Sequence, residues 1–419
     1  MFGADSNLVA VPKELAPIIT RDSDQECDPR DVGMTQTGVG KIWSAIESYY
    51  RTGLQPAIML VLRRHGRIVM RRAIGHARGN GPGERGQEKV LATPDTPICL
   101  FSASKAVTAM LIHKLAELRK LRLDDHVTHY IPEYGAHGKG DTTLRHLLTH
   151  RAGIPQIAIP DVDVRMLYDW DGILQMLCEA RPVYRRDTLQ AYHAINGGFI
   201  LGEVARRVSG DSLPQLLKKW IAAPLGAHHL TYGLSKARRA ATATNYHTGP
   251  LTPFPFNVIS KRILGVPFER VVEISNTDAF LSSIIPSGNM YATADEMCRF
   301  FQMMLNSGEL DGRRLFKADT VAEAIRPYDG FTIDRSFFLP LRFSAGMVLG
   351  EWPFGLYGPD CPGAFGHLGF MTTLCWADPR RDISVGFLTT GKSLTPTTLL
   401  AMARILTAIN FNCPLLQNY

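Results

Sequence analysis

Several patterns that would assign a function quickly are missing from this chain of 419 residues. Its seven cysteines stand far apart, without a CxxC pair or a neighbouring Cys/His set. That scatter argues against a disulfide framework and against a zinc site. The Gly-x-Ser-x-Gly elbow of the α/β-hydrolases is also absent, and no internal repeat or low-complexity tract is present. We therefore expect no metal and no cofactor.

Long hydrophobic runs and strong charge clusters are lacking too. No apolar run is long enough to span a bilayer, and Met1 to Ser6 contain neither a charged nor an apolar region of a signal peptide. We expect a cytoplasmic protein without a membrane span. The net charge of +7 is spread thinly. Basic pairs such as Arg63-Arg64 and Arg380-Arg381 are short and lack interleaved aromatics, so they indicate solvated surface rather than a nucleic-acid partner.

The most informative stretch that is present runs from Phe101 to Lys105. Ser102 is the only serine followed three positions later by a lysine. In a helix, residues three apart lie on one face, so the Ser102 hydroxyl and the Lys105 amine would emerge side by side. A serine hydroxyl is a poor nucleophile near neutral pH, and a desolvated amine within hydrogen-bond reach can activate it.

A four-residue match also arises by chance, so the context of Ser102 matters. Residues 96–101 read as a short strand, and residues 106–112 are apolar on nearly every side, which is typical of a helix buried in a domain. A lysine at the mouth of such a helix is costly to bury without a function or a partner. The context therefore favours a catalytic serine.

The remaining patterns predict an antiparallel sheet built from both ends of the chain. Two β-rich runs, 56–62 and 67–74, flank a short turn with a glycine, which predicts a hairpin. The last hundred residues return to β-signals at 343–349, 364–376 and 383–389 and end in a helix at 395–409. The middle is mainly helical, and a further helix is expected at 294–305. We expect an N-terminal arm, a split sheet domain and a mainly helical lobe at residues 1–37, 38–105 with 276–419, and 106–275, respectively.

Residues 386–393 satisfy the P-loop pattern, Gly-x-x-x-x-Gly-Lys-Ser. Gly386, however, lies within an apolar strand pattern rather than in a flexible loop. Only 26 residues follow Ser393, too few for the strand and aspartate that a nucleotide site needs downstream. We therefore reject a nucleotide site.

Over residues 40–410 the chain resembles the serine β-lactamase and penicillin-binding-protein superfamily, most closely the class C-like, family VIII-type carboxylesterases. The resemblance is carried by an ordered set of stretches: 101–105, Leu123-Asp124-Asp125, 144–155, Tyr192-His193-Ala194, Thr293-Ala294-Asp295 and 365–369. It implies an α/β (α+β) fold of the β-lactamase/transpeptidase type. In that fold an antiparallel β-sheet is flanked by helices, and an all-helical lobe forms one wall of the site.

The resemblance also implies roles for individual residues. Ser102 looks like the acylated nucleophile and Lys105 like its neighbouring base or proton relay. Tyr192 looks like the family tyrosine, whose phenol would have a lowered pKa beside an ammonium. The triplet His367-Leu368-Gly369 stands at the substrate-binding strand, and the N–H groups of Ser102 and Phe370 would form the oxyanion hole. From the residue alone, a core tyrosine is the better reading of Tyr192, and only its position in the family pattern favours a catalytic role. His367 can also be read as a hydrogen-bonded histidine in a strand.

Two departures from the β-lactamase pattern bear on the substrate. The tyrosine motif ends in Ala194 instead of asparagine, with Asn196 two positions on, and His367 replaces a lysine. The spacing from Tyr192 to Gly202 is also one residue longer than usual. Losing groups that hold an amide and a carboxylate points toward a small-molecule ester as substrate. A rival triplet, residues 247–249, lies in a proline-rich connection without a strand pattern.

The leading hypothesis is thus a serine carboxylesterase that works through an acyl-enzyme on Ser102. A β-lactamase or D-amino-acid peptidase, an acyltransferase, and a catalytically silent binding scaffold remain as alternatives. The sequence does not decide the acyl and alcohol preferences or the oligomeric state.

Overall fold

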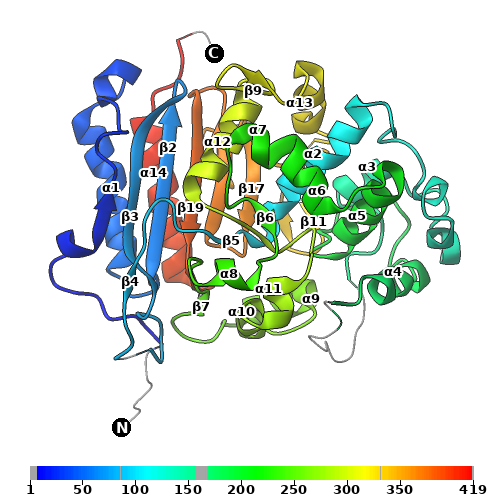
Figure 1. The fold of residues 1–419 in the computed structure, drawn as a ribbon, viewed down its shortest axis with the longest axis horizontal. Coiled ribbons are helices and arrows are strands. Elements are labelled where there is room, and N and C mark those ends of the chain that lie inside the picture. The colour runs from blue at the N-terminus through cyan, green and yellow to red at the C-terminus, as the bar shows by residue number, and fades with distance from the viewer. Residues whose placement is uncertain (1–6, 85, 157–165, 167, 331, 418–419) are drawn as a thin grey trace.

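A computed structural model describes residues 7–84, 86–156, 166, 168–330 and 332–417 (Figure 1). Its centre is a nine-stranded sheet in which every neighbouring pair is antiparallel. The predicted α/β fold with an antiparallel sheet is confirmed. The strands run in the order β1 (Ile19–Arg21), β3 (Arg67–Arg78), β2 (Ala57–Arg64), β19 (Ile383–Thr389), β18 (Thr373–Asp378), β17 (Phe365–Gly369), β14 (Val348–Leu349) and β13 (Arg342–Phe343), with β4 (Val90–Leu91) paired to β3.

Both chain ends meet in this sheet, as the sequence predicts. β2 and β3 form the expected hairpin, and β2 also pairs with β19, with Leu60 opposite Phe387. Two predicted strands were wrong in extent. Residues 343–349 contain a turn at Gly346, where φ is +125°, and residues 364–376 are split by a turn in which Phe370 and Met371 have positive φ. A backbone in the left-handed region cannot continue a strand.

The two faces of the sheet carry separate cores. Along β2, Ile58, Leu60 and Leu62 face the cluster with α1 (Gln36–Tyr50) and α14 (Pro396–Asn412). The alternating residues Ala57, Met59 and Val61 face the cluster with α2 (Ser104–Glu117) and α12 (Ala294–Leu305). Because helices cover both faces, this strand is apolar at every position from 57 to 62. Figure 1 shows α1 and α14 on one side of the sheet and α12 on the other.

A mainly helical region lies beside the sheet, to the right in Figure 1. Its helices begin at side-chain caps in several places; Asp169, for example, accepts from the Gly172 N–H ahead of α4. The helices are α3 (Leu144–Leu148), α4 (Trp170–Glu179), α5 (Asn196–Ser209), α6 (Leu213–Leu217), α7 (Ala223–Leu225), α8 (Lys236–Arg239), α9 (Phe256–Leu264), α10 (Phe268–Ser275) and α11 (Asp278–Ser282); α13 (Ala318–Ile325) follows later in the chain.

Short strands connect these parts. The one that matters for the site is β5, which pairs with β8 directly ahead of Ser102. The short strands are β5 (Ile98–Cys99), β6 (Thr231–Tyr232), β7 (Tyr246–His247), β8 (Met290–Ala292), β9 (Glu309–Leu310), β10 (Arg313–Arg314), β11 (Ile333–Asp334), β12 (Leu339–Pro340), β15 (Phe354–Gly355), β16 (Gly358–Pro359) and β20 (Gly391–Lys392).

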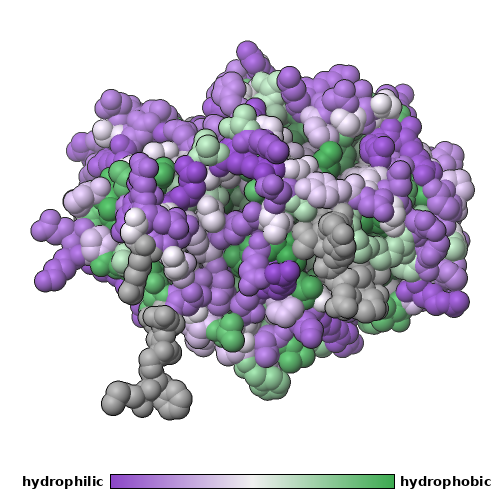
Figure 2. Space-filling view, turned by 60° about the horizontal axis from the view of Figure 1, so that its bottom comes forward, coloured by the Kyte–Doolittle hydropathy of each residue, from purple (hydrophilic) through white to green (hydrophobic). Residues whose placement is uncertain are grey.

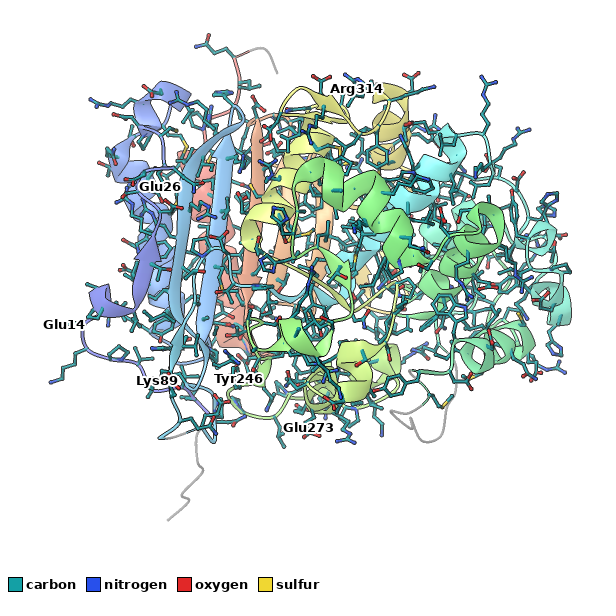
Figure 3. The ribbon with its side chains drawn as sticks, viewed as in Figure 1. Glu14, Glu26, Lys89, Tyr246, Glu273 and Arg314 are labelled. Carbon is teal, nitrogen blue, oxygen red and sulfur yellow. The ribbon has the colours of Figure 1, made fainter. Side chains whose placement is uncertain are left out.

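The N-terminal segment adds the edge strand β1 and an ion-pair cluster to the sheet. The Glu26 carboxylate, labelled in Figure 3, lies 2.7 Å from both the Arg21 and the Arg72 guanidinium. Its side chain is only 2% exposed, so these charge-assisted bonds are shielded from water. Within the described residues no helix is both long and apolar enough to cross a bilayer.

The P-loop pattern belongs to the sheet and not to a phosphate-binding loop. Gly386 lies inside β19, and a Cβ there would stand 2.1 Å from the Ala294 carbonyl oxygen. Glycine is therefore needed at this position so that α12 can pack closely on the strand. The rejection of a nucleotide site is consistent with this arrangement.

Candidate active site

Ser102 lies in a tight turn that leads directly into α2. Residues 101–103 form one turn of 3-10 helix, and Phe101 has a φ of +46°. The Ser104 hydroxyl holds this turn, because it donates to the Phe101 carbonyl and accepts from the Met290 N–H. A strained, well-tied backbone beside a reactive group is typical of functional sites. Ser102 and Lys105 remain on one side of the helix start, with Lys105 Nζ 3.3 Å from Ser102 Oγ.

The Lys105 amine has an environment without charge. It donates to the carbonyl oxygens of Ala194, at 2.6 Å, and Ser287, at 3.1 Å. Among the described residues, no carboxylate forms an ion pair with it. Burial lowers the pKa of Lys105 well below its ordinary value, because an ammonium loses hydration that neutral carbonyls replace only in part. Burial therefore favours the neutral form of the amine.

Tyr192 lies next to Lys105, as the resemblance implies. Lys105 Nζ stands 4.8 Å from the centre of the Tyr192 ring, and the ring is 4% exposed. The phenol lies beside Ser102, yet its oxygen has no hydrogen-bond partner among the described residues.

The prediction of a lowered phenol pKa for Tyr192 was wrong. Burial raises the pKa of Tyr192, and the nearby carboxyl of Asp334 adds to the effect. The physical reason is desolvation, because a buried phenolate loses hydration that its surroundings do not replace.

Strand β17 brings its end against the Ser102 turn. A Cβ on Gly369 would lie 2.0 Å from the Leu100 carbonyl oxygen, so only glycine allows this approach. Just beyond, Phe370 has a φ of +42° and stacks on Phe101 at 4.8 Å between ring centres. In the described part of the chain, neither the Ser102 N–H nor the Phe370 N–H is bonded to a backbone acceptor. Two such donors beside one hydroxyl can bind a developing oxyanion.

His367 and Leu368 complete the strand at the site. His367 is 1% exposed, and its Nδ1–H donates to the Leu368 carbonyl at 2.7 Å. Burial and, to a smaller extent, the neighbouring Lys105 lower the pKa of His367 to about 3. The ring is therefore neutral, 6.3 Å from the Tyr192 ring between centres. Leu368 is half-buried and packs in the cluster that contains Tyr192.

Two neighbouring histidines were missed in the sequence. The His150 ring lies 4.6 Å from the Tyr192 ring, and its Nδ1 accepts from the His193 N–H. His193 in turn donates to the Ala191 carbonyl and accepts from the Ile154 N–H. Burial lowers the pKa of both rings. Both lie within stretches that carry the resemblance, so that resemblance was the available signal.

The departures from the β-lactamase pattern have clear structural counterparts. Ala194 contributes only its carbonyl oxygen to Lys105, and no side-chain amide reaches the amine from this position. Asn196 instead donates to the Ile154 carbonyl at the start of α5. The rival triplet is elsewhere: His247 lies in β7, bonded to Asn7 and 3.8 Å from Glu269.

Comparison with known proteins agrees with the observed fold. The family model Beta-lactamase matches residues 46–408. Esterase/beta-lactamase LipL of Mycobacterium tuberculosis is 27% identical over 307 residues, covering 69% of this chain and 68% of LipL. A penicillin-binding-protein homologue from Caulobacter crescentus superposes with a TM-score of 0.77 at 25% identity, covering 89% of this chain and 96% of that one. A family VIII carboxylesterase superposes with a TM-score of 0.75 at 27% identity, covering 88% and 96%. The chain thus belongs to the β-lactamase family, whose fold and hydrolase framework it shares.

Proposed function

We propose that the protein is a serine hydrolase that cleaves carboxylic esters through an acyl-enzyme on Ser102. The observation that carries this proposal is the bonding of Lys105. A neutral amine has two N–H groups and one lone pair. Two carbonyl oxygens take the N–H groups, which leaves the lone pair for the Ser102 hydroxyl 3.3 Å away. The amine is therefore oriented to accept the serine proton.

The reaction proceeds in two balanced halves. Ser102 Oγ bonds to the ester carbonyl carbon while its proton passes to Lys105, and the carbonyl oxygen becomes an oxyanion held by the N–H groups of Ser102 and Phe370. The carbon–oxygen bond to the alcohol then breaks, and the proton returns through the Tyr192 hydroxyl to the leaving alcohol. Water repeats the sequence on the acyl group and releases the acid. Each oxyanion donor contributes about 3 kcal/mol.

The charges at the site favour an ester over a β-lactam or a peptide. His367 is neutral where β-lactamases carry a lysine, so no cation stands there to hold a substrate carboxylate. Ala194 lacks an amide to bind the amide of a β-lactam or peptide. The family VIII protein is named a carboxylesterase, and LipL is named both an esterase and a beta-lactamase, so both names support an ester as one substrate.

The test is turnover of p-nitrophenyl butanoate and of a chromogenic cephalosporin by wild type and Ser102→Ala. We expect ester hydrolysis to exceed cephalosporin hydrolysis and to fall by about 10⁴ or more in the variant. A phosphonate should add its mass to the Ser102 peptide of the wild type alone. Undiminished ester turnover in Ser102→Ala, or no adduct, would refute the proposal.

A further inference from the structure

A large hydrophobic cavity lies between α4, α9, α10 and the start of α5. Its volume is about 890 Å³, within the range of about 300–1,000 Å³ that suits a drug-sized ligand. Its walls are mainly aliphatic and aromatic, and they include Ile173, Met176, Val266, Phe268, Val271 and Phe280. Figure 2 turns this side of the molecule toward the reader and shows hydrophobic surface among hydrophilic residues there.

The cavity reaches the candidate active site through two contacts. Phe268, in its wall, stacks on Phe370 at 4.3 Å between ring centres. Ala194 also lines it, and the carbonyl of the same residue binds Lys105 at 2.6 Å. Ser102, Lys105 and Phe370 do not line the cavity themselves, so Phe268 and Ala194 are the residues through which it borders the site.

The two flanks of Ser102 differ in a way that assigns the cavity to one half of the ester. The leaving alcohol must lie beside Tyr192, which returns its proton. The Tyr192 ring contacts His150, Phe337 and Phe343, which do not line the cavity, and it shares a hydrophobic cluster with Ala194 and Ile263, which do. Phe268, which stacks directly on Phe370, brings the cavity wall next to the oxyanion donors, and on this contact we assign the cavity to the acyl group.

Building on the proposed esterase function, we propose that this cavity binds the acyl group and that the substrates are esters of long-chain or bulky hydrophobic acids. A polar or very short acyl group would leave the apolar walls uncovered. Because burial of one methylene increases affinity about fourfold at best, kcat/KM rises with each carbon until the cavity is filled.

The test varies the two halves of the substrate separately. With p-nitrophenyl esters, we expect kcat/KM to increase at least tenfold from acetate to octanoate. With alkyl butanoates assayed by acid release, we expect less than a threefold change from ethyl to octyl alcohol. A profile that is flat with acyl length, or that rises with alcohol length instead, would overturn the assignment.

Two wall variants sharpen this test. Val271→Trp and Met176→Trp fill the cavity from opposite walls, so each should lower kcat/KM for octanoate tenfold or more and leave acetate within about threefold. The acetate rate also reports whether each variant has folded.

Val90→Trp is the matched control on β4, outside the cavity, and should keep the wild-type profile. If Val271→Trp and Met176→Trp both keep the wild-type acyl profile, the proposal is wrong. Loss of all activity in Ser102→Ala with a flat acyl profile would refute the cavity assignment and leave the esterase proposal intact.

An independent observation concerns Lys392, in the segment that matches the P-loop pattern. It is fully buried, and its Nζ donates to the Thr389 carbonyl at 2.7 Å and to Thr373 Oγ1 at 3.4 Å. The amine also lies 5.3 Å from the centre of the Phe101 ring, directly before Ser102. No carboxylate forms an ion pair with it in the described part of the chain.

Such an amine is costly to bury, so its place behind Phe101 calls for an explanation. Burial lowers the pKa of Lys392 to about 7. The titratable neighbours are Cys99, whose own pKa burial raises to about 12, and His247 across the β7–β20 ladder, whose pKa burial lowers. Neither carries charge at neutral pH, so Lys392 titrates nearly alone.

We infer that Lys392 is a positioning residue that holds Phe101, and through it the Ser102 N–H, in the oxyanion-binding geometry. A protonated amine attracts the face of the Phe101 ring, and a neutral amine does not. This attraction fixes the left-handed backbone at Phe101. Protonation thus favours the productive turn, and the activity declines as the amine loses its proton.

The test is the pH dependence of kcat/KM for a short ester. In the wild type we expect a decline as the pH rises through about 7. Lys392→Met should remove this decline and lower kcat/KM at pH 6 about tenfold. Lys392→Arg stays charged throughout the titration, so it should remain active and show no decline. Lys139→Met is the matched control: Lys139 is also buried, and it donates to three carbonyl oxygens far along the chain from Ser102. Persistence of the decline in Lys392→Met, or its loss in Lys139→Met, would overturn the inference.

Discussion

Strands β2 and β19 are buried along their whole length, whereas residues 251–258 beside the helical cavity leave Leu251, Phe254 and Val258 more than half exposed. The sheet side supplies Ser102 and the turn at Phe370, which are held by backbone bonds and close packing. The helical side supplies Tyr192, the Ala194 carbonyl and the apolar cavity. The proposed nucleophile and oxyanion donors thus lie on the closely packed sheet side. The proposed substrate-binding surface lies on the helical side, where more apolar side chains are exposed.

The largest expected effect tests the chemistry at the junction of these two regions. Lys105→Met should lower kcat by about 10³–10⁴, because the variant lacks the base that takes the Ser102 proton. Lys139→Met loses a lysine of similar burial in the helical region and should retain kcat within about threefold while losing stability. Both are measured by steady-state turnover and thermal unfolding. Equal losses of kcat in the two variants would contradict a special role for Lys105.

The next effect separates close packing at the site from close packing elsewhere in the sheet. Gly369→Ala pushes β17 away from Leu100 and should lower kcat about 10²-fold through the Phe370 donor. Gly386→Ala creates a similar clash with α12, at 2.1 Å. Each should cost about 1–3 kcal/mol of stability. At a temperature at which both variants are folded, only Gly369→Ala should lower kcat. If Gly386→Ala is equally inactive at that temperature, the oxyanion assignment fails.

A pH titration of stability compares one histidine from each region. Burial lowers the pKa of His367 in the sheet to about 3 and that of His193 in the helical region to about 4, against 6.5 in the unfolded chain. Between these values the unfolded chain binds more protons, so stability decreases as the pH falls below 6.5. The slope is about 1.4 kcal/mol per pH unit for each ring.

Replacing either ring by glutamine should remove one of these contributions, as measured by urea unfolding at pH 7 and pH 5. If His193→Gln leaves the slope unchanged while His367→Gln reduces it, the two regions unfold separately.

The smallest effect concerns matched helix caps. Thr293 caps α12 on the sheet, and Thr277 caps α11 in the helical region. Replacing either by alanine should cost about 1 kcal/mol. Hydrogen exchange then shows whether Thr277→Ala loosens only its own region. Uniform loosening in both variants would mean that sheet and helices form one cooperative unit.

Local patterns were enough to predict the hairpin, the helix at 294–305 and the strand at 383–389, because each has a strong apolar period and clear ends. They failed where the backbone turns sharply, at Gly346 and at Phe370, because the pattern of apolar side chains does not indicate the backbone angle φ. The pairing of Ser102 with Lys105 was predictable because it is local. The carbonyl of Ser287, which holds the amine, is 182 positions away and had no signal of its own.

The sequence by itself determined which groups can react: a serine with a lysine one turn later, and a tyrosine and a histidine in the order of a known family. Only the tertiary structure decided their charge. Burial favours the neutral amine of Lys105 and the protonated phenol of Tyr192, whereas the resemblance implied an ammonium beside a phenol of lowered pKa. The physical reason is that desolvation depends on every atom packed around a group, and those atoms come from segments far apart in the chain.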